Sequence, residues 1–251
     1  MWLRDYHVDA LRLDAVHSIF DMSAKPFLQE LAEKVSDFSK ISRKRFLIAE
    51  SDLNDIKTVK TIGEGGQGID AQWCDDLHHS LHTLLTGEHH GYYKDFGRIE
   101  DLVKALREGF VYSWTYSEYR KKHHGNSSLD LLAKKFVVCY QNHDQVGNRP
   151  FGERLSTLIS FEALKLAAGI VMLSPYIPLI FMGEEHAEKS PFLYFISHSD
   201  SKVVKAVREG RKRENNDPCE PHDPQDLETF LRSKINWHCR TVGKHKAMFD
   251  Y

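Results

Sequence analysis

Carboxylate side chains recur where short apolar segments of this sequence end. Asp14 closes the segment VDALRLD, Glu50 follows RFLIA, and Asp144 lies in the polar row QNHDQVGN that follows FVVCY. Two carboxyl groups held about 5 Å apart can cleave a glycosidic bond with retention, one as nucleophile and one as proton donor. The three carboxylates predict a glycoside hydrolase site, provided that the fold brings them together.

The neighbours of these carboxylates suit such roles. Arg12 lies two positions before Asp14, so on a strand both side chains point to one face, where the guanidinium would keep the nucleophile ionised. Glu50 ends an apolar strand, where desolvation favours the protonated form that an acid catalyst needs. Asp144, between polar neighbours, is placed to bind sugar hydroxyls and to stabilise positive charge at the anomeric carbon.

The segments that must position these groups alternate between strand and helix patterns. Apolar segments bounded by polar or breaker residues predict five buried parallel strands, at residues 8–14, 45–50, 69–75, 135–141 and 178–183. This alternation predicts an α/β fold of the (β/α)8 barrel type, in which the carboxyl ends of the strands share one face and build the active site.

Helical periodicity links these strands. It predicts helices at residues 23–38, 76–86, 99–110 and 155–173, with Ser23 as the N-cap of the first. Residues 210–226 are polar and carry three prolines, which predicts a surface excursion.

A structural explanation of the acidic strand ends is that they cap the next helix. The third and fifth predicted strands also end in acidic residues, at Asp75 and Asp76 and at Glu184 and Glu185. Capping explains any one of the five strand ends about as well as catalysis does, but it explains all five together poorly. Glu50 and Asp144 are also not followed at once by a helical pattern.

Composition narrows the function classes. The 251 residues are 41% hydrophobic and 28% charged with a net charge of -2, which is ordinary for a globular protein and argues against a nucleic-acid partner. No run of about eighteen apolar residues predicts a membrane span, and the first residues do not resemble a secretion signal. The widely spaced cysteines predict reduced thiols in the cytoplasm; they are Cys74, Cys139, Cys219 and Cys239.

Three stretches resemble signature regions of the α-amylase superfamily, glycoside hydrolase family 13. They are ALRLDAVH (10–17), FLIAES (46–51) and QNHDQVGN (141–148). Their order and their placement on successive strands also match the family. Further stretches are similar to the members that release trehalose, namely AQWCDDLHHSLHTLLTGEHHGYYKDFG (71–97), PLIFMGEE (178–185) and PFLYFISHSDSKVVKAVREGRKRE (191–214).

The resemblance implies a role for each matching residue. Asp14 would be the nucleophile, Glu50 the general acid and base, and Asp144 the transition-state stabiliser. The implied sugar-binding residues are Arg12, His17, Asn142, His143 and Gln145, and those for the terminal trehalose unit are Asp75, Asp76, His78 and His79. The implied reaction cleaves the α-1,4 bond next to the terminal α,α-trehalose of a malto-oligosyltrehalose, with retention and with neither cofactor nor metal.

Other interpretations stay open at this stage. His78 and His82 stand at i and i+4 on a predicted helix, as zinc ligands can, although the catalytic glutamate of an HExxH motif is missing. A metal-dependent hydrolase is therefore a competing class. Another glucan hydrolase or transferase of the amylase type and a non-catalytic maltodextrin-binding remnant are further alternatives. The aromatic residues Tyr92, Tyr93 and Phe96 predict either a sugar platform or a lid over the chain's own core.

A closed (β/α)8 barrel needs eight strands, and five are predicted here. The resemblance places them as strands four to eight within residues 1–190, with the last barrel helix and a C-terminal extension in residues 191–251. We expect strands one to three and the flanking N-terminal sandwich and C-terminal β domains of the family to be absent. Unpaired edges favour association, so the chain is expected to be a fragment, or to be completed by a companion chain, with little activity alone.

Overall fold

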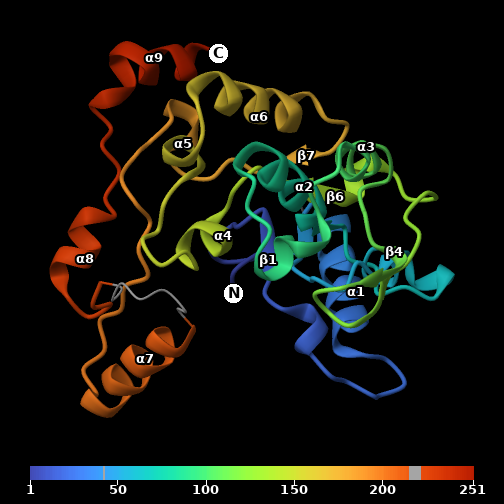
Figure 1. The fold of residues 1–251 in the computed structure, drawn as a ribbon. Helices are drawn as coiled ribbons and strands as arrows, with labels where there is room; N and C mark the ends of the chain where they lie inside the picture. Colours follow the sequence, from blue (N-terminus) through green and yellow to red (C-terminus); the bar gives the residue numbers. More distant parts are fainter. Residues whose placement is uncertain (42, 215–221) are drawn as a thin grey trace. The chain divides into compact units, whose positions relative to one another are not determined.

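The structure of this protein is a computed structural model that describes residues 1–41, 43–214 and 222–251 (Figure 1). These residues divide into two compact units. The first comprises Met1–Tyr140 and Val171–Pro178, and the second comprises Gln141–Ile170 and Leu179–Tyr251. The boundary predicted after residue 190 separates the barrel strands from the last barrel helix of a complete protein. These two units do not test it, so it stays a prediction.

A parallel five-stranded sheet forms the centre of the first unit. Its order is β1 (Ala10–Leu13), β2 (Phe46–Ala49), β3 (Ala71–Trp73), β6 (Phe136–Val138) and β7 (Ile177–Pro178). Each strand lies beside the strand that precedes it in this sheet, and all four pairings are parallel. This order is that of successive strands in a (β/α) barrel, which confirms the predicted fold class.

The first four strands lie within the predicted segments, but the prediction of a fifth strand at 178–183 is wrong. The strand is Ile177–Pro178 and both of its residues are exposed. Pro178 has no N–H to give to a ladder. Beyond it the chain turns, since Glu184 donates its N–H to the carbonyl of Phe181 and Gly183 adopts a φ of 89°. Within this run Phe181 is buried, whereas Ile180 and Met182 are about half exposed, so the run does not behave as a buried strand.

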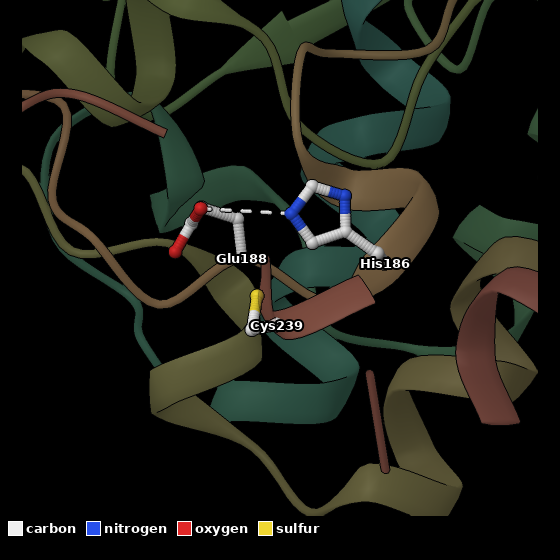
Figure 2. Close-up of side chains that lie close together, drawn as sticks. All are labelled: His186, Glu188 and Cys239. Atoms are coloured by element: carbon white, nitrogen blue, oxygen red, sulfur yellow. Dashed lines mark ion pairs between the residues drawn. The ribbon is translucent and has the colours of Figure 1, made fainter. Parts of the chain in front are cut away.

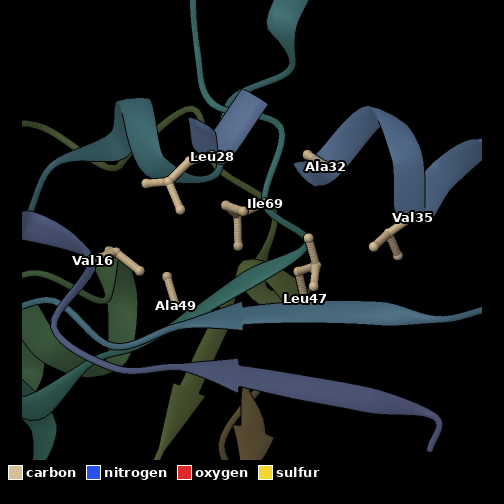
Figure 3. Close-up of a cluster of buried hydrophobic side chains, with 7 residues drawn as sticks. All are labelled: Val16, Leu28, Ala32, Val35, Leu47, Ala49 and Ile69. Atoms are coloured by element: carbon tan, nitrogen blue, oxygen red, sulfur yellow. The ribbon is translucent and has the colours of Figure 1, made fainter. Parts of the chain in front are cut away.

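Helix α1 (Phe27–Lys40) covers one face of the sheet. It buries Leu28, Ala32 and Val35 at helical spacing. These side chains belong to one cluster with residues from the sheet side (Figure 3), namely Val16, Leu47, Ala49 and Ile69. Because alternate residues of β2 point to opposite faces, the other face of the strand ends is left for polar groups.

The predicted start of α1 at Ser23 is wrong. Pro26 occupies the N-cap position, and the Asp21 carboxylate accepts the N–H of Phe27 at 2.5 Å. Proline with its fixed φ suits the entry to a helix, whereas Ser23 lies in the preceding turn. The helix therefore begins four residues later than the apolar periodicity alone predicts.

Two further helices follow their predicted ranges closely, α2 (Asp75–Thr86) and α3 (Ile99–Glu108). The single helix predicted at 155–173 is wrong, because it is broken into α5 (Leu155–Leu158) and α6 (Phe161–Leu173). The break follows from Ser160, whose hydroxyl accepts the N–H of Ala163 and so starts a new helix.

Several elements carry too weak an apolar pattern to be predicted. They are the antiparallel hairpin β4 (Ser113–Ser117) and β5 (Lys122–Gly125), and the helices α4 (His143–Gly147), α7 (Ser201–Glu214), α8 (Leu227–Arg232) and α9 (Gly243–Asp250). Short 3-10 helices are η1 (Val16–Ser18), η2 (Ile56–Thr58), η3 (Ile62–Glu64), η4 (Gly91–Asp95), η5 (Ala133–Lys135), η6 (Glu184–His186) and η7 (Cys239–Thr241).

The surface excursion predicted at 210–226 begins inside α7, and its central part, with Cys219, lies outside the described residues. Within the described ranges, no helix has the length and apolar character that crossing a bilayer requires.

The core between α1 and the sheet makes a direct prediction about stability. Leu47 is 1% exposed, so Leu47→Ala should lower the free energy of unfolding by about 2–5 kcal/mol through lost burial and a residual cavity. Met22→Ala is the matched control because Met22 is 97% exposed, and its effect should stay within about 0.5 kcal/mol. Urea denaturation of both variants measures the difference. Equal losses in the two variants would contradict this account of the core.

Candidate active site

Arg12 binds two carboxylates at the ends of β1 and β2. One terminal nitrogen donates to Asp14, and the other lies 3.8 Å from the Glu50 carboxylate. The register explains the meeting: Leu13 stands opposite Ala49, so the next residues, Asp14 and Glu50, leave adjacent parallel strands side by side. The two-residue spacing of Arg12 and Asp14 thus places both on one face, as predicted from the sequence.

The two carboxylates differ in their surroundings. The Asp14 side chain is 79% exposed and accessible to a ligand, whereas the Glu50 side chain is 18% exposed. The N–H of Ala15 donates to Glu50 Oε2 at 2.6 Å. Ala15 adopts the left-handed region with φ 42°, which is unusual for a residue with a side chain and aims its amide at Glu50. One group therefore faces solvent while the other is held by the backbone.

Trp73 supports this arrangement from β3. The guanidinium of Arg12 lies over the Trp73 ring at 4.4 Å from its centroid. A cation above an indole face is attracted by the ring, and the flat stack fixes the plane of the guanidinium. In this structure the Trp73 ring therefore serves as a platform for Arg12.

His17 lies beside a second ion pair of the same unit, formed by Asp52 and Arg120. Its Nε2 lies 3.8 Å from Asp52, and Arg120 donates to the other oxygen of Asp52 at 2.9 Å. Burial would raise the pKa of Asp52, but the hydrogen bond and charge of Arg120 hold it below its usual value. Sequence reasoning missed Asp52 and Arg120. The only signal was that Asp52 directly follows the signature FLIAES.

Asp76 is a buried anchor of α2. It is 3% exposed and accepts hydrogen bonds from the side chain of Asn54 at 2.7 Å and from the amides of Val111 and Tyr112 at 2.6 and 3.1 Å. Burial raises its pKa to about 6. The structure gives Asp76 the role of joining three segments. Its neighbour Asp75 is half-buried at the start of the helix.

His78 is buried on α2 with both ring nitrogens engaged. Nδ1 lies 2.8 Å from the carbonyl oxygen of Tyr140 and must donate to it, so Nε2 accepts from the Tyr93 hydroxyl at 2.9 Å. Burial holds the pKa of His78 far below its usual value. The imidazole is neutral and has no nitrogen left for a metal. His82, its predicted co-ligand, instead pairs with Glu88 at 2.8 Å, so the zinc interpretation of this helix loses its basis.

His79 packs among aromatic rings. Its ring lies 4.9 Å from that of Tyr92 and 5.0 Å from that of Phe96, measured between centroids. Burial lowers its pKa to about 3, so the ring is neutral at physiological pH. Tyr93 and Phe96 are themselves buried. This packing favours the lid interpretation of the aromatic segment over an exposed sugar platform.

The polar row after β6 forms a capped helix in the second unit. The side chain of Asn142 accepts the N–H groups of Asp144 and Gln145 at 2.8 and 3.4 Å and so begins α4. His143 Nε2 lies 3.4 Å from Asp144. The statement that no helix follows Asp144 is wrong, because Asp144 is the second residue of α4. Its meeting with Asp14 and Glu50 of the first unit stays a prediction.

Comparisons with known proteins agree with this architecture. No protein-family model matches the chain. It is 52% identical over 236 residues to the malto-oligosyltrehalose trehalohydrolase of Saccharolobus solfataricus, covering 94% of this chain and 41% of that protein. It is 43% identical to the malto-oligosyltrehalose trehalohydrolase of a Rhizobium species, covering 100% and 43%. A crystal structure titled putative alpha amylase, from Salmonella typhimurium, matches with a TM-score of 0.92 and 39% identity, covering 99% and 43%.

These matches confirm the predicted resemblance to the α-amylase superfamily and to its trehalose-releasing members. The chain spans less than half the length of the curated relatives it matches, as expected of a part of such a protein.

The burial of Asp76 makes a prediction about pH. A carboxyl group whose pKa rises from its usual value of 3.8 to about 6 on folding contributes stability that is fully present below pH 3.8 and is lost as the pH rises through 6. Relative to Asp76→Asn, the native chain should lose about 2 kcal/mol between pH 4 and pH 7, at about 1.36 kcal/mol per pKa unit, because the unfolded carboxyl is already more than half ionised at pH 4. Urea denaturation of both proteins at each pH gives the difference. Parallel stability profiles would show that the ionised carboxylate carries no such cost.

Proposed function

We propose that this chain carries the nucleophile and the acid–base group of a retaining glycoside hydrolase. Its substrate would be malto-oligosyltrehalose, cleaved at the α-1,4 bond next to the terminal α,α-trehalose so that trehalose is released. The observation that carries the proposal is the bridge from Arg12 to Asp14 and Glu50 at the ends of adjacent parallel strands. The names of the related trehalohydrolases support the choice of bond and product.

The surroundings of the two carboxylates suit a double displacement. Asp14, exposed and paired with Arg12, would attack the anomeric carbon and form a glycosyl–enzyme intermediate. Glu50, more enclosed, would give its proton to the leaving oxygen and then take a proton from the water that releases the sugar. Retention follows from two successive inversions.

The remaining site residues are assigned within the same proposal. Asp144 would stabilise positive charge at the anomeric carbon, and the sugar would contact Arg12, His17, Asn142, His143 and Gln145. Trehalose recognition is assigned to the α2 residues Asp75, Asp76, His78 and His79. Since Asp76 and His78 are buried and fully used by protein partners, we infer that they shape the α2 surface from within.

A companion segment belongs to this proposal. In the described residues β1 pairs with β2 alone, which leaves its other edge available to a further strand. A groove of about 500 Å³ is lined by Leu11 of β1 together with residues of the N-terminus and of α1, including the apolar Leu3 and Phe38. The relatives' greater length supports such a segment. The proposed location is the cytoplasm, because the four cysteines are widely spaced in the sequence and form no CxxC pair.

A chimera tests the catalytic assignment in a complete protein. This chain would replace the matching part of the Saccharolobus solfataricus trehalohydrolase, to which it is 52% identical. Trehalose release from malto-oligosyltrehalose should fall at least about 10³-fold in Asp14→Asn and in Glu50→Gln, because each removes one of the two displacement groups. Asp144→Asn should also lower kcat strongly. The exposed carboxylate of Asp130 supplies the control, Asp130→Asn, which should keep the rate of the unmodified chimera.

Chemical rescue separates the two roles. Azide added to Asp14→Ala should form a glycosyl azide with inverted configuration, whereas azide added to Glu50→Ala should form one with retained configuration. If instead Asp14→Ala gave the retained azide and Glu50→Ala the inverted one, Glu50 would be the nucleophile and Asp14 the acid–base group. Full activity in both variants would disprove the proposal, and release of glucose or maltose in place of trehalose would indicate another amylase-type enzyme.

We expect the isolated 251-residue chain to have little or no hydrolytic activity, because within the described residues β1 pairs on one side only and the related trehalohydrolases are more than twice as long as this chain. The same trehalose assay compares it with the chimera at equal concentration. Calorimetric titration with a maltodextrin tells whether the inactive chain still binds sugar. Turnover equal to that of the chimera would mean that no companion segment is needed.

A further inference from the structure

A buried histidine of the second unit lies between two carboxylates and has no aligned hydrogen bond. His186 ends η6 and is 0% exposed. Its Nδ1 lies 3.3 Å from Glu185 and its Nε2 lies 3.5 Å from Glu188. Within the described residues neither nitrogen has a hydrogen-bond partner of acceptable geometry. Buried polar groups are almost always satisfied, so the surroundings of this ring call for an explanation.

Glu188 presents a charged oxygen to this histidine. It is 3% exposed and its carboxylate accepts the amides of Lys189 and Ser190 at 2.7 and 2.8 Å and of Asn236 at 2.6 Å. Three N–H donors favour the charged form. A carboxylate can accept about four hydrogen bonds, so one lone pair remains on the side that faces His186. Figure 2 shows this carboxylate directed at the ring.

Cys239 brings a thiol to the same place. It begins η7, and its sulfur lies near Glu188 and His186 (Figure 2). One donor atom from each of the three residues falls within 4.8 Å of the others. The segment is held there by the bond between the Asn236 amide and Glu188, three residues before Cys239. The sequence separates His186 and Cys239 by about fifty positions, so no spacing motif reveals the cluster.

We propose that His186, Glu188 and Cys239 bind a divalent metal ion of the zinc type, with water as the fourth ligand. Imidazole nitrogen, thiolate sulfur and carboxylate oxygen are the donors that Zn²⁺ prefers in tetrahedral sites. Two ligands each about 2.0 Å from such an ion stand roughly 3.3 Å apart, close to the 3.5 Å between His186 Nε2 and Glu188 Oε2. The cation would lie between Nε2 of His186 and Oε2 of Glu188.

Glu185 lies beside the other ring nitrogen of His186, Nδ1. Metal-binding histidines usually give their other N–H to a carboxylate, which fixes the tautomer and raises the basicity of the ligating nitrogen. The Glu185 oxygen at 3.3 Å from Nδ1 is in position for this role and leaves Nε2 for the metal. The ion would join the η6 segment to the η7 segment in the second unit. We therefore infer a structural site, separate from the residues assigned to catalysis.

Cobalt binding provides the test, because Co²⁺ accepts tetrahedral zinc geometry and gives a thiolate charge-transfer band near the ultraviolet. The reduced, chelator-treated 251-residue chain is titrated with Co²⁺ alone. One equivalent should produce the thiolate band and intense tetrahedral d–d bands, and Zn²⁺ should remove both. Cys239→Ser should lose the thiolate band. Cys219→Ser is the matched control and should retain the thiolate band. Co²⁺ bound by other histidines alone would not give this band, because the band requires a sulfur ligand.

Two further measurements keep the proposal falsifiable should a variant fold poorly. Glu185→Gln should weaken metal affinity about 10–100-fold and still reach the native spectrum at saturation. Zn²⁺ should raise the Tm of the native chain and leave that of Cys239→Ser unchanged. Absence of the thiolate band at one equivalent, or the same band in Cys239→Ser, would overturn the proposal.

Discussion

The positive charge of Arg12 makes the rest of the candidate site possible. Two carboxylates at the ends of neighbouring parallel strands repel each other, and the cost of that repulsion grows as the site excludes water. Arg12 reaches both Asp14 and Glu50 and lies flat on Trp73, so one guanidinium links three consecutive strands of the sheet. Without this link the acidic strand ends would be a source of instability.

The parallel sheet supplies the geometry for this link. Leu11 and Leu13 pack toward the core that α1 covers, while Arg12 points the other way, so one strand serves both the core and the site. On the core side, Leu11 and Leu13 pack against the cluster that contains Leu47 and Ala49 of β2. Polar chemistry on one face therefore depends on apolar packing on the other.

Sequence reasoning succeeded where a single physical signal dominated. The strands around Arg12 and Ile48 follow from apolar runs with polar ends, and α2 follows from its period. It failed where backbone chemistry overrode hydrophobicity, as at Pro178 and at Ser160, which interrupts a long apolar pattern. The partnership of Asp52 with Arg120 was beyond prediction because sixty-eight positions separate the two residues and a hairpin brings them together.

In the proposed mechanism, the amide of Ala15 would favour one oxygen of Glu50 over the other as the proton donor. Oε2 already accepts that N–H at 2.6 Å and lies 3.8 Å from an Arg12 nitrogen, so a hydrogen on the same atom would face other N–H donors. An acidic Glu50 would hold its hydrogen on Oε1. The leaving oxygen of a sugar must then approach from the Oε1 side, which gives proton delivery a fixed direction. The strained, left-handed conformation of a single alanine would thus decide the lateral trajectory of the transfer.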